Sequence, residues 1–104
     1  MQLAGKIVVV TGGANGIGRA LSIRFAAEGA KAVVVADLDA HGANVTASKC
    51  GGTAIEADVA RESEVQRLVR ETLDRFGTID LFCSNAGIGA DGGPEASDAD
   101  WEQS

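Results

Sequence analysis

Tyrosine is absent from this chain of 104 residues, and aromatic residues make up only 4% of it. A hydrophobic core must therefore be built mostly from Val, Ile, Leu and Ala. Basic residues are also in deficit, because nine Lys and Arg stand against fifteen Asp and Glu and the formal net charge is −6. An acidic chain has no general attraction for nucleic-acid phosphates or anionic lipids. We therefore expect neither nucleic acid nor a membrane as a partner.

Cysteine, histidine and long apolar runs are scarce as well. Cys50 and Cys83 stand alone without CxxC spacing, and His41 is the single histidine, so we expect ordinary thiols in a reducing compartment. The acids of residues 91–102 lack a convergent scaffold, so we predict no metal site. The aliphatic runs Ile7–Val10 and Ala32–Ala36 are far shorter than the roughly 20 residues that span a bilayer. The first residues contain no apolar segment of the signal-peptide type. These features favour a cytoplasmic protein.

The apolar residues that are present form four short runs with the composition of strands. They lie at residues 6–11, 31–37, 53–59 and 79–85. The first two are continuous and β-branched, which is typical of strands buried on both faces of a parallel sheet. Helical periodicity lies between the runs, at residues 17–28, 39–50 and 58–76. Strands that alternate with helices predict an α/β fold with right-handed crossovers, and the length predicts one domain over residues 1–104.

A glycine-rich turn, Thr11 to Gly18, separates the first predicted strand from the first predicted helix. Glycines permit a tight turn and a close approach of backbone N–H groups to a ligand. The helix N-terminus that follows presents unpaired N–H groups and the positive end of its dipole to an anion. Gly18 would let helix and strand pack closely. In this position the turn predicts a binding site for the pyrophosphate of a dinucleotide.

The spacing T-G-x-x-x-G-x-G, with Gly12, Gly16 and Gly18, resembles that of the short-chain dehydrogenases/reductases. Further matches follow in order along nearly the whole chain. They are Asp37 after the second strand, Asp58-Val59 after the third, Ser84-Asn85-Ala86-Gly87 after the fourth, and Trp101 in a helix start. Ser84 departs mildly, because the family more often has Asn there. The resemblance implies a Rossmann-type doubly wound parallel sheet, here partial, with four strands in the order 3-2-1-4.

The resemblance also implies roles for the residues of the glycine turn and the second strand. The residues that would cradle the adenosine side and the pyrophosphate are Gly12, Asn15, Gly16, Ile17 and Gly18. Asp37 would accept hydrogen bonds from the adenine-ribose hydroxyls, and its charge would repel a 2′-phosphate. NADP-preferring relatives often place a basic residue where Asn15 and Leu38 stand, and neither is basic. We therefore predict NAD(H) as the cofactor.

The remaining implied contacts lie after the third and fourth strands. Asp58 and Val59 would hold the adenine ring, Asp58 through the adenine amino group. Asn85, Ala86 and Gly87 would flank the ribose and the path to the nicotinamide. Simpler structural roles stay open beside these. Asp37 could cap the next helix, Asp58 could be the N-cap of the third helix, and Asn85 could tie neighbouring strands together.

The family transfers hydride between nicotinamide and an alcohol or carbonyl, using a Tyr and a Lys four residues later. This chain has no Tyr, and Lys6, Lys31 and Lys49 all precede the region of that motif. We predict no catalytic residue in residues 1–104, and expect the chain by itself to bind NAD weakly or not at all and to catalyse nothing. An alcohol or carbonyl substrate would be a partner only if the rest of the enzyme is supplied. Its fourth strand would be a sheet edge, which favours a homo-oligomer.

Two other functions fit parts of the pattern. A non-catalytic nucleotide-binding or interaction module could use half of a Rossmann fold without chemistry. A flavodoxin-like or receiver domain would share the strand and helix order. The second alternative does not account for Asp37, Asp58 and Asn85 together, so the site residues favour the dinucleotide-binding portion of a short-chain oxidoreductase.

Overall fold

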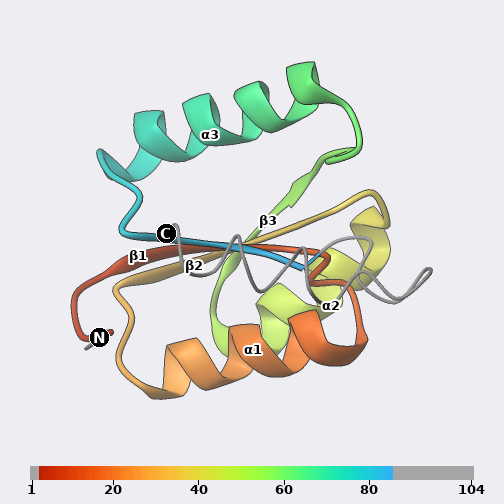
Figure 1. Cartoon of the computed structure of the whole chain (residues 1–104). Coiled ribbons are helices and arrows are strands. Elements are labelled where there is room, and N and C mark those ends of the chain that lie inside the picture. The colour runs from red at the N-terminus through yellow and green to blue at the C-terminus, as the bar shows by residue number, and fades with distance from the viewer. Residues whose placement is uncertain (1–2, 86–104) are drawn as a thin grey trace.

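The computed structural model describes residues 3–85, and in this range the chain forms a three-layer α/β fold (Figure 1). Its elements in chain order are β1 (Ile7–Thr11), α1 (Gly16–Ala27), β2 (Ala32–Asp37), α2 (Ala40–Cys50), β3 (Thr53–Glu56), α3 (Glu62–Phe76) and β4 (Leu81–Ser84). The four strands are parallel and follow the order β3-β2-β1-β4. The predicted fold class and strand order are thereby confirmed, including the position of β4 at an edge of the described sheet.

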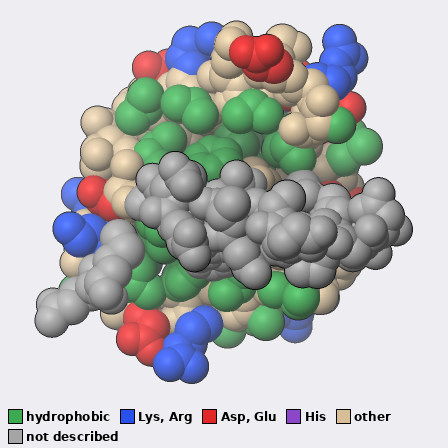
Figure 2. All heavy atoms as spheres, viewed as in Figure 1, with side chains coloured by type: hydrophobic (Ala, Val, Ile, Leu, Met, Phe, Trp, Pro, Cys, Tyr) green, Lys and Arg blue, Asp and Glu red, His purple; other side chains and the backbone are tan. Residues whose placement is uncertain are grey.

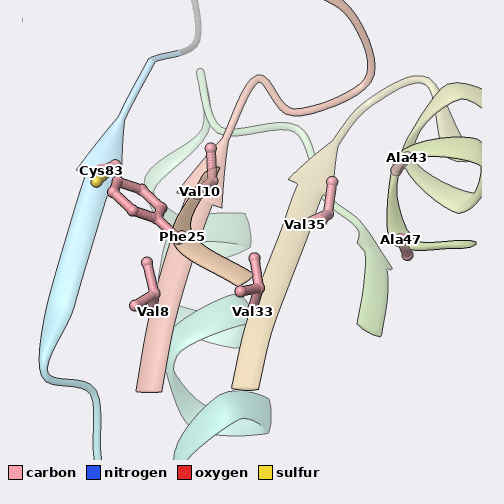
Figure 3. Close-up of a cluster of buried hydrophobic side chains, with 8 residues drawn as sticks. All are labelled: Val8, Val10, Phe25, Val33, Val35, Ala43, Ala47 and Cys83. Atoms are coloured by element: carbon pink, nitrogen blue, oxygen red, sulfur yellow. The ribbon is translucent and has the colours of Figure 1, made fainter. Parts of the chain in front are cut away.

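The sheet has two hydrophobic faces because successive strand side chains alternate. Val8 and Val10 of β1 lie on the same face as Val33 and Val35 of β2, where Phe25 of α1 packs against them (Figure 3). The opposite face carries a second cluster that includes Leu68 of α3. Helices α1 and α2 therefore cover one face and α3 covers the other (Figure 1). All five residues of β1 are buried, as expected for a continuous β-branched run between two strands.

Two boundaries differ from the sequence prediction by more than two residues. Strand β3 ends at Glu56, not at residue 59, and α3 begins at Glu62, not at residue 58. Between them the Asp58 carboxylate accepts a hydrogen bond from the N–H of Ala60 at 3.1 Å. This local turn stops the extended chain, and it also prevents Asp58 from starting the helix. The N-cap of α3 is Arg61, so the interpretation of Asp58 as that cap is wrong.

The apolar stripes of the helices are wider than the faces they bury. Ile17, an apolar residue at the start of α1, is 62% exposed. On α3, Leu68 is completely buried whereas Leu73 is 42% exposed. Figure 2 shows hydrophobic side chains gathered on one face of the molecule, with most of the charged side chains in that view toward its rim. Among the described residues, no helix has both the length and the hydrophobicity needed to cross a membrane.

Candidate functional site

The carboxyl ends of the strands meet at one edge of the sheet. Register pairs Thr11 of β1 with Ala36 of β2 and with Ser84 of β4, so the segments that follow these strands lie together. Such an edge is where ligands bind in open parallel sheets. The glycine turn, Asp37 and Asn85 are all brought to this place, as predicted from the sequence.

The first half of the turn is fastened to β2 by its own N–H groups. The N–H groups of Gly12 and Gly13 donate to the carbonyl of Ala36, at 2.8 and 3.3 Å. The N–H of Ala14 donates to Oδ2 of Asp37 at 3.0 Å. Gly12 also adopts the left-handed backbone conformation, with φ 72°. The amide of Gly12 is therefore already paired within the protein, and this glycine shapes the turn.

The second half of the turn is left with free donors. Within residues 3–85, the N–H groups of Gly16, Ile17 and Gly18 donate to no acceptor. Asn15 is the N-cap of α1, but its side chain accepts no capping hydrogen bond, and the first turn of α1 contains no acidic residue. A Cβ built on Gly16 would meet no atom within 4 Å, so there is open space at the turn. Three unpaired amides at a helix N-terminus fit a pyrophosphate.

Gly18 and Gly13 allow the close packing that shapes this turn. A Cβ on Gly18 would lie 2.0 Å from the carbonyl oxygen of Gly12. A Cβ on Gly13 would lie 2.6 Å from Cγ1 of Val35. The sequence prediction included Gly18 but missed Gly13, although the glycine doublet after the strand was a usable signal. A larger residue at Gly18 would require the turn to move, and one at Gly13 would require the turn or the Val35 side chain to move.

Asp37 joins the turn to the start of α2. Its Oδ2 accepts the N–H of Ala14, and its Oδ1 accepts the N–H of Asp39 at 2.9 Å. The N-cap of α2 is Asp39, whose side chain accepts the N–H of Gly42 at 3.0 Å, so Asp37 does not cap this helix. An ionised carboxylate has about four acceptor sites. Two therefore stay available to a ligand, beside a Leu38 side chain that is 61% exposed.

Asn85 occupies the other side of the turn. Its backbone N–H donates to Oγ1 of Thr11 at 3.0 Å, and its Nδ2 donates to the carbonyl of Gly12 at 3.4 Å. Thr11 Oγ1 in turn donates to the carbonyl of Cys83 at 3.3 Å. The side chain thus ties β4 to the glycine turn, which is the structural alternative considered for it. The predicted contacts of Ala86 and Gly87 lie outside the described residues, as does the helix start near Trp101.

Asp58 and Val59 lie in the connection between β3 and α3. One oxygen of Asp58 holds the N–H of Ala60, and the other accepts no hydrogen bond within residues 3–85. Val59 is half-buried and packs against the cluster that contains Leu68. The connection is fixed to β2, because the N–H of Ala57 donates to the carbonyl of Asp37 at 3.0 Å. Asp58 and Asp37 are therefore held on neighbouring strand ends.

Arg19 is a residue of this region that the sequence did not reveal. Its Nε donates to Oγ1 of Thr46 at 2.8 Å, and its Nη2 donates to the carbonyl of Ala14. The side chain connects the glycine turn to α2. No spacing rule marks a single arginine on the first turn of a helix, since its partners are five and 27 residues away.

The comparisons agree with this arrangement. A model described as short chain dehydrogenase matches residues 6–104. Sorbitol dehydrogenase of Cereibacter sphaeroides is 41% identical over 90 residues, 85% of this chain and 35% of that protein. L-fucose dehydrogenase of Mus musculus is 46% identical over 87 residues, 83% of this chain and 32% of that protein.

Solved structures extend the comparison to three dimensions. The crystal structure of 3-ketoacyl-(acyl-carrier-protein) reductase from Brucella melitensis complexed with NADH matches with a TM-score of 0.73 and 38% identity, over 77% of this chain and 34% of that one. This chain spans about a third of the length of these relatives. Because the family model matches nearly the whole sequence, the chain belongs to the short-chain dehydrogenase family.

Proposed function

We propose that this chain is the NAD(H)-binding portion of an oxidoreductase that transfers hydride between nicotinamide and an alcohol or carbonyl substrate. The observation that carries the proposal is that three unpaired amides at the start of α1 and the fixed carboxylate of Asp37 lie at the same edge of the sheet. The amides of Gly16, Ile17 and Gly18 would receive the pyrophosphate. Asp37 would accept hydrogen bonds from the hydroxyls of the adjacent ribose at its two free acceptor sites.

The choice of NAD(H) over NADP(H) follows from charge. A 2′-phosphate would bring a second anion against the Asp37 carboxylate, and like charges in contact repel. Neither Asn15 nor Leu38, on either side of this position, supplies a cation. The free oxygen of Asp58 would accept a hydrogen bond from the adenine amino group. Asn85 would lie toward the nicotinamide ribose.

The nicotinamide ring supplies the hydride chemistry when the cofactor is bound. The residues of this chain would bind and orient the dinucleotide, and we assign no catalytic group among residues 1–104. The alcohol or carbonyl substrate would be held by parts of the enzyme that this chain does not provide.

Calorimetric titration with NADH and NADPH tests the proposal. We expect the wild type to bind NADH more tightly by at least about tenfold, which corresponds to about 1.4 kcal/mol. Asp37→Asn should reduce this preference, because it removes the negative charge. Asp74→Asn is the matched control, since Asp74 is an exposed acid on α3, far along the chain from the turn. Equal or tighter binding of NADPH by the wild type would refute the cofactor assignment.

A further inference from the structure

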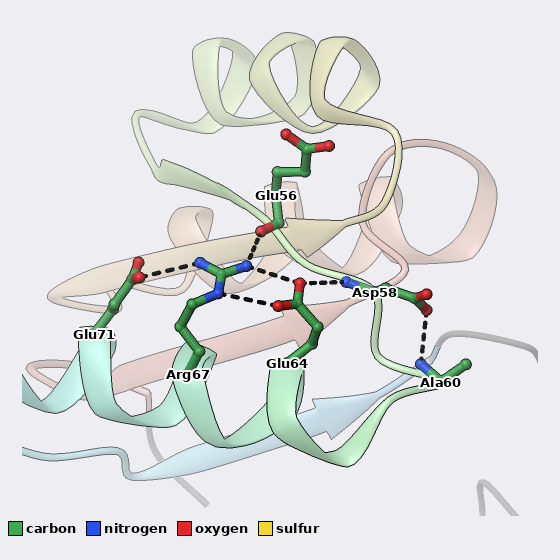
Figure 4. A network of polar contacts seen from close by, with 6 residues as sticks. All are labelled: Glu56, Asp58, Ala60, Glu64, Arg67 and Glu71. Atoms are coloured by element: carbon green, nitrogen blue, oxygen red, sulfur yellow. Dashed lines mark hydrogen bonds and ion pairs between the residues drawn. The ribbon is translucent and has the colours of Figure 1, made fainter.

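A charged network on α3 holds the connection that carries Asp58 and Val59 (Figure 4). Nη2 of Arg67 donates to the backbone carbonyl of Glu56 at 2.6 Å and to Oε1 of Glu64 at 3.0 Å. Nε of Arg67 donates to Oε2 of Glu64 at 3.3 Å. The guanidinium therefore joins the last residue of β3 to the first turn of α3.

Glu64 completes the connection on its other side. Its Oε1 accepts the backbone N–H of Asp58 at 3.3 Å. Hydrogen bonding to Arg67 lowers the pKa of Glu64, and the N–H of Asp58 lowers it further, so the carboxylate stays ionised. The Glu64–Arg67 pair thus holds residues 56 and 58 from one side, while β2 holds Ala57 through the carbonyl of Asp37.

Glu71 fixes the arginine in turn. Nη1 of Arg67 donates to Oε2 of Glu71 at 3.0 Å. With an acid on either side, the guanidinium has a defined direction toward the carbonyl of Glu56. The groove beside it is lined by Leu38, Glu56, Glu64 and Arg67, among others. The pair therefore borders the same groove as Leu38, the exposed residue that follows Asp37.

The exposure of the pair indicates what it does. The side chains of Arg67 and Glu64 are 32% and 31% exposed, and ion pairs at such positions contribute little to global stability. Their backbone partners, however, are the two residues on either side of Ala57. Restraint of this short connection is a local effect. It sets the backbone position of Asp58, and the hydrogen bond from Ala60 then orients the Asp58 carboxylate with its free oxygen.

We infer that Arg67 and Glu64 are positioning residues that set the geometry of Asp58 and Val59 and thereby the recognition of the adenine ring. The inference rests on the proposed function, because it assigns the adenine end of the dinucleotide to this connection. The role assigned to the two side chains needs no direct contact with the cofactor. Both act through the backbone of residues 56–58.

The test compares NADH with the dinucleotide in which hypoxanthine replaces adenine and the exocyclic amino group is lost. Affinities are measured by calorimetry on the full chain. We expect the wild type to prefer NADH by about tenfold, the effect of one hydrogen bond to a charged group. Asp58→Asn removes the negative charge from that acceptor, so it should lower the preference for NADH. Arg67→Met and Glu64→Gln should lower the preference in the same direction, and Arg67→Lys should restore part of it.

Arg24→Met is the matched control. It breaks an ion pair of the same kind, to Glu28 at 2.7 Å, on the exposed side of α1. This variant should keep the wild-type preference, and thermal melting should show that all variants are folded. The readout is a ratio of two affinities, so a general loss of binding does not imitate the expected result.

The outcomes separate the two proposals. If the wild type fails to bind NADH, the proposed function is wrong and this inference falls with it. If the wild type and Asp58→Asn behave as expected but Arg67→Met and Glu64→Gln keep the wild-type ratio, only the positioning role is refuted. Equal weakening of both dinucleotides in these variants would also refute it, because that result shows a structural effect without adenine selectivity.

Discussion

The contact between Gly18 and Gly12 leads to a sharp prediction for Gly18→Ala. The new Cβ would lie 2.0 Å from the Gly12 carbonyl oxygen and 2.8 Å from Cα of Gly13. Real Cβ atoms essentially never approach closer than 3.0 Å, so α1 and the turn must separate by about 1 Å. The colliding atoms belong to the backbone, so no side-chain rotation relieves the clash.

The magnitude follows from three effects. Overpacking costs about 1–3 kcal/mol, and a rigid backbone partner favours the upper end of that range. Moving the turn weakens at least one of the two hydrogen bonds to the carbonyl of Ala36, at a cost of about 1 kcal/mol. Alanine is a better helix former than glycine by about 1 kcal/mol. We therefore expect Gly18→Ala to lower the free energy of unfolding by about 3 kcal/mol, and NADH affinity to fall at least tenfold.

Urea denaturation and calorimetry measure the two effects. Gly16→Ala is the comparison at the same turn, because its Cβ would meet open space and its cost comes only from the positive φ of 57°. That strain costs about 1–2 kcal/mol. A Gly18→Ala protein as stable as the wild type, or more stable than Gly16→Ala, would show that the close approach of helix and turn does not hold in solution.

Three further predictions concern the body of the domain. Leu68→Ala should lower the free energy of unfolding by about 2–5 kcal/mol, whereas Leu73→Ala on the exposed side of α3 should cost under about 1 kcal/mol in the same urea experiment. Burial raises the pKa of the Cys83 thiol to about 12, so at pH 8 iodoacetamide should modify Cys50 well before Cys83, as mass spectrometry of folded and unfolded protein would show. Because the pKa of Glu64 is lowered in the fold, its stabilising effect is present above the ordinary glutamate pKa and is lost as pH falls through the lowered value; the stability difference between wild type and Glu64→Gln should shrink there.

The parts of the site that sequence predicted are those with a local cause. A buried β-branched strand followed by closely spaced glycines and a helix has few other interpretations, and Asp37 is placed by the end of its own strand. The strand order has no such local cause; the family pattern implied it, and the register confirms it. The start of α3 was misplaced, because periodicity did not register the turn that the Asp58 side chain forms with Ala60.

Residue types and their spacing determined that this chain would form a parallel sheet with a glycine turn at its carboxyl edge, since those signals act between neighbours along the backbone. Only the tertiary structure decided which groups hold that turn and which remain free. The amide of Ala14 meets Asp37 across 23 residues, and Arg67 reaches the carbonyl of Glu56 from a different element. Such partners are chosen by how helices pack on the sheet, and no local pattern encodes that geometry.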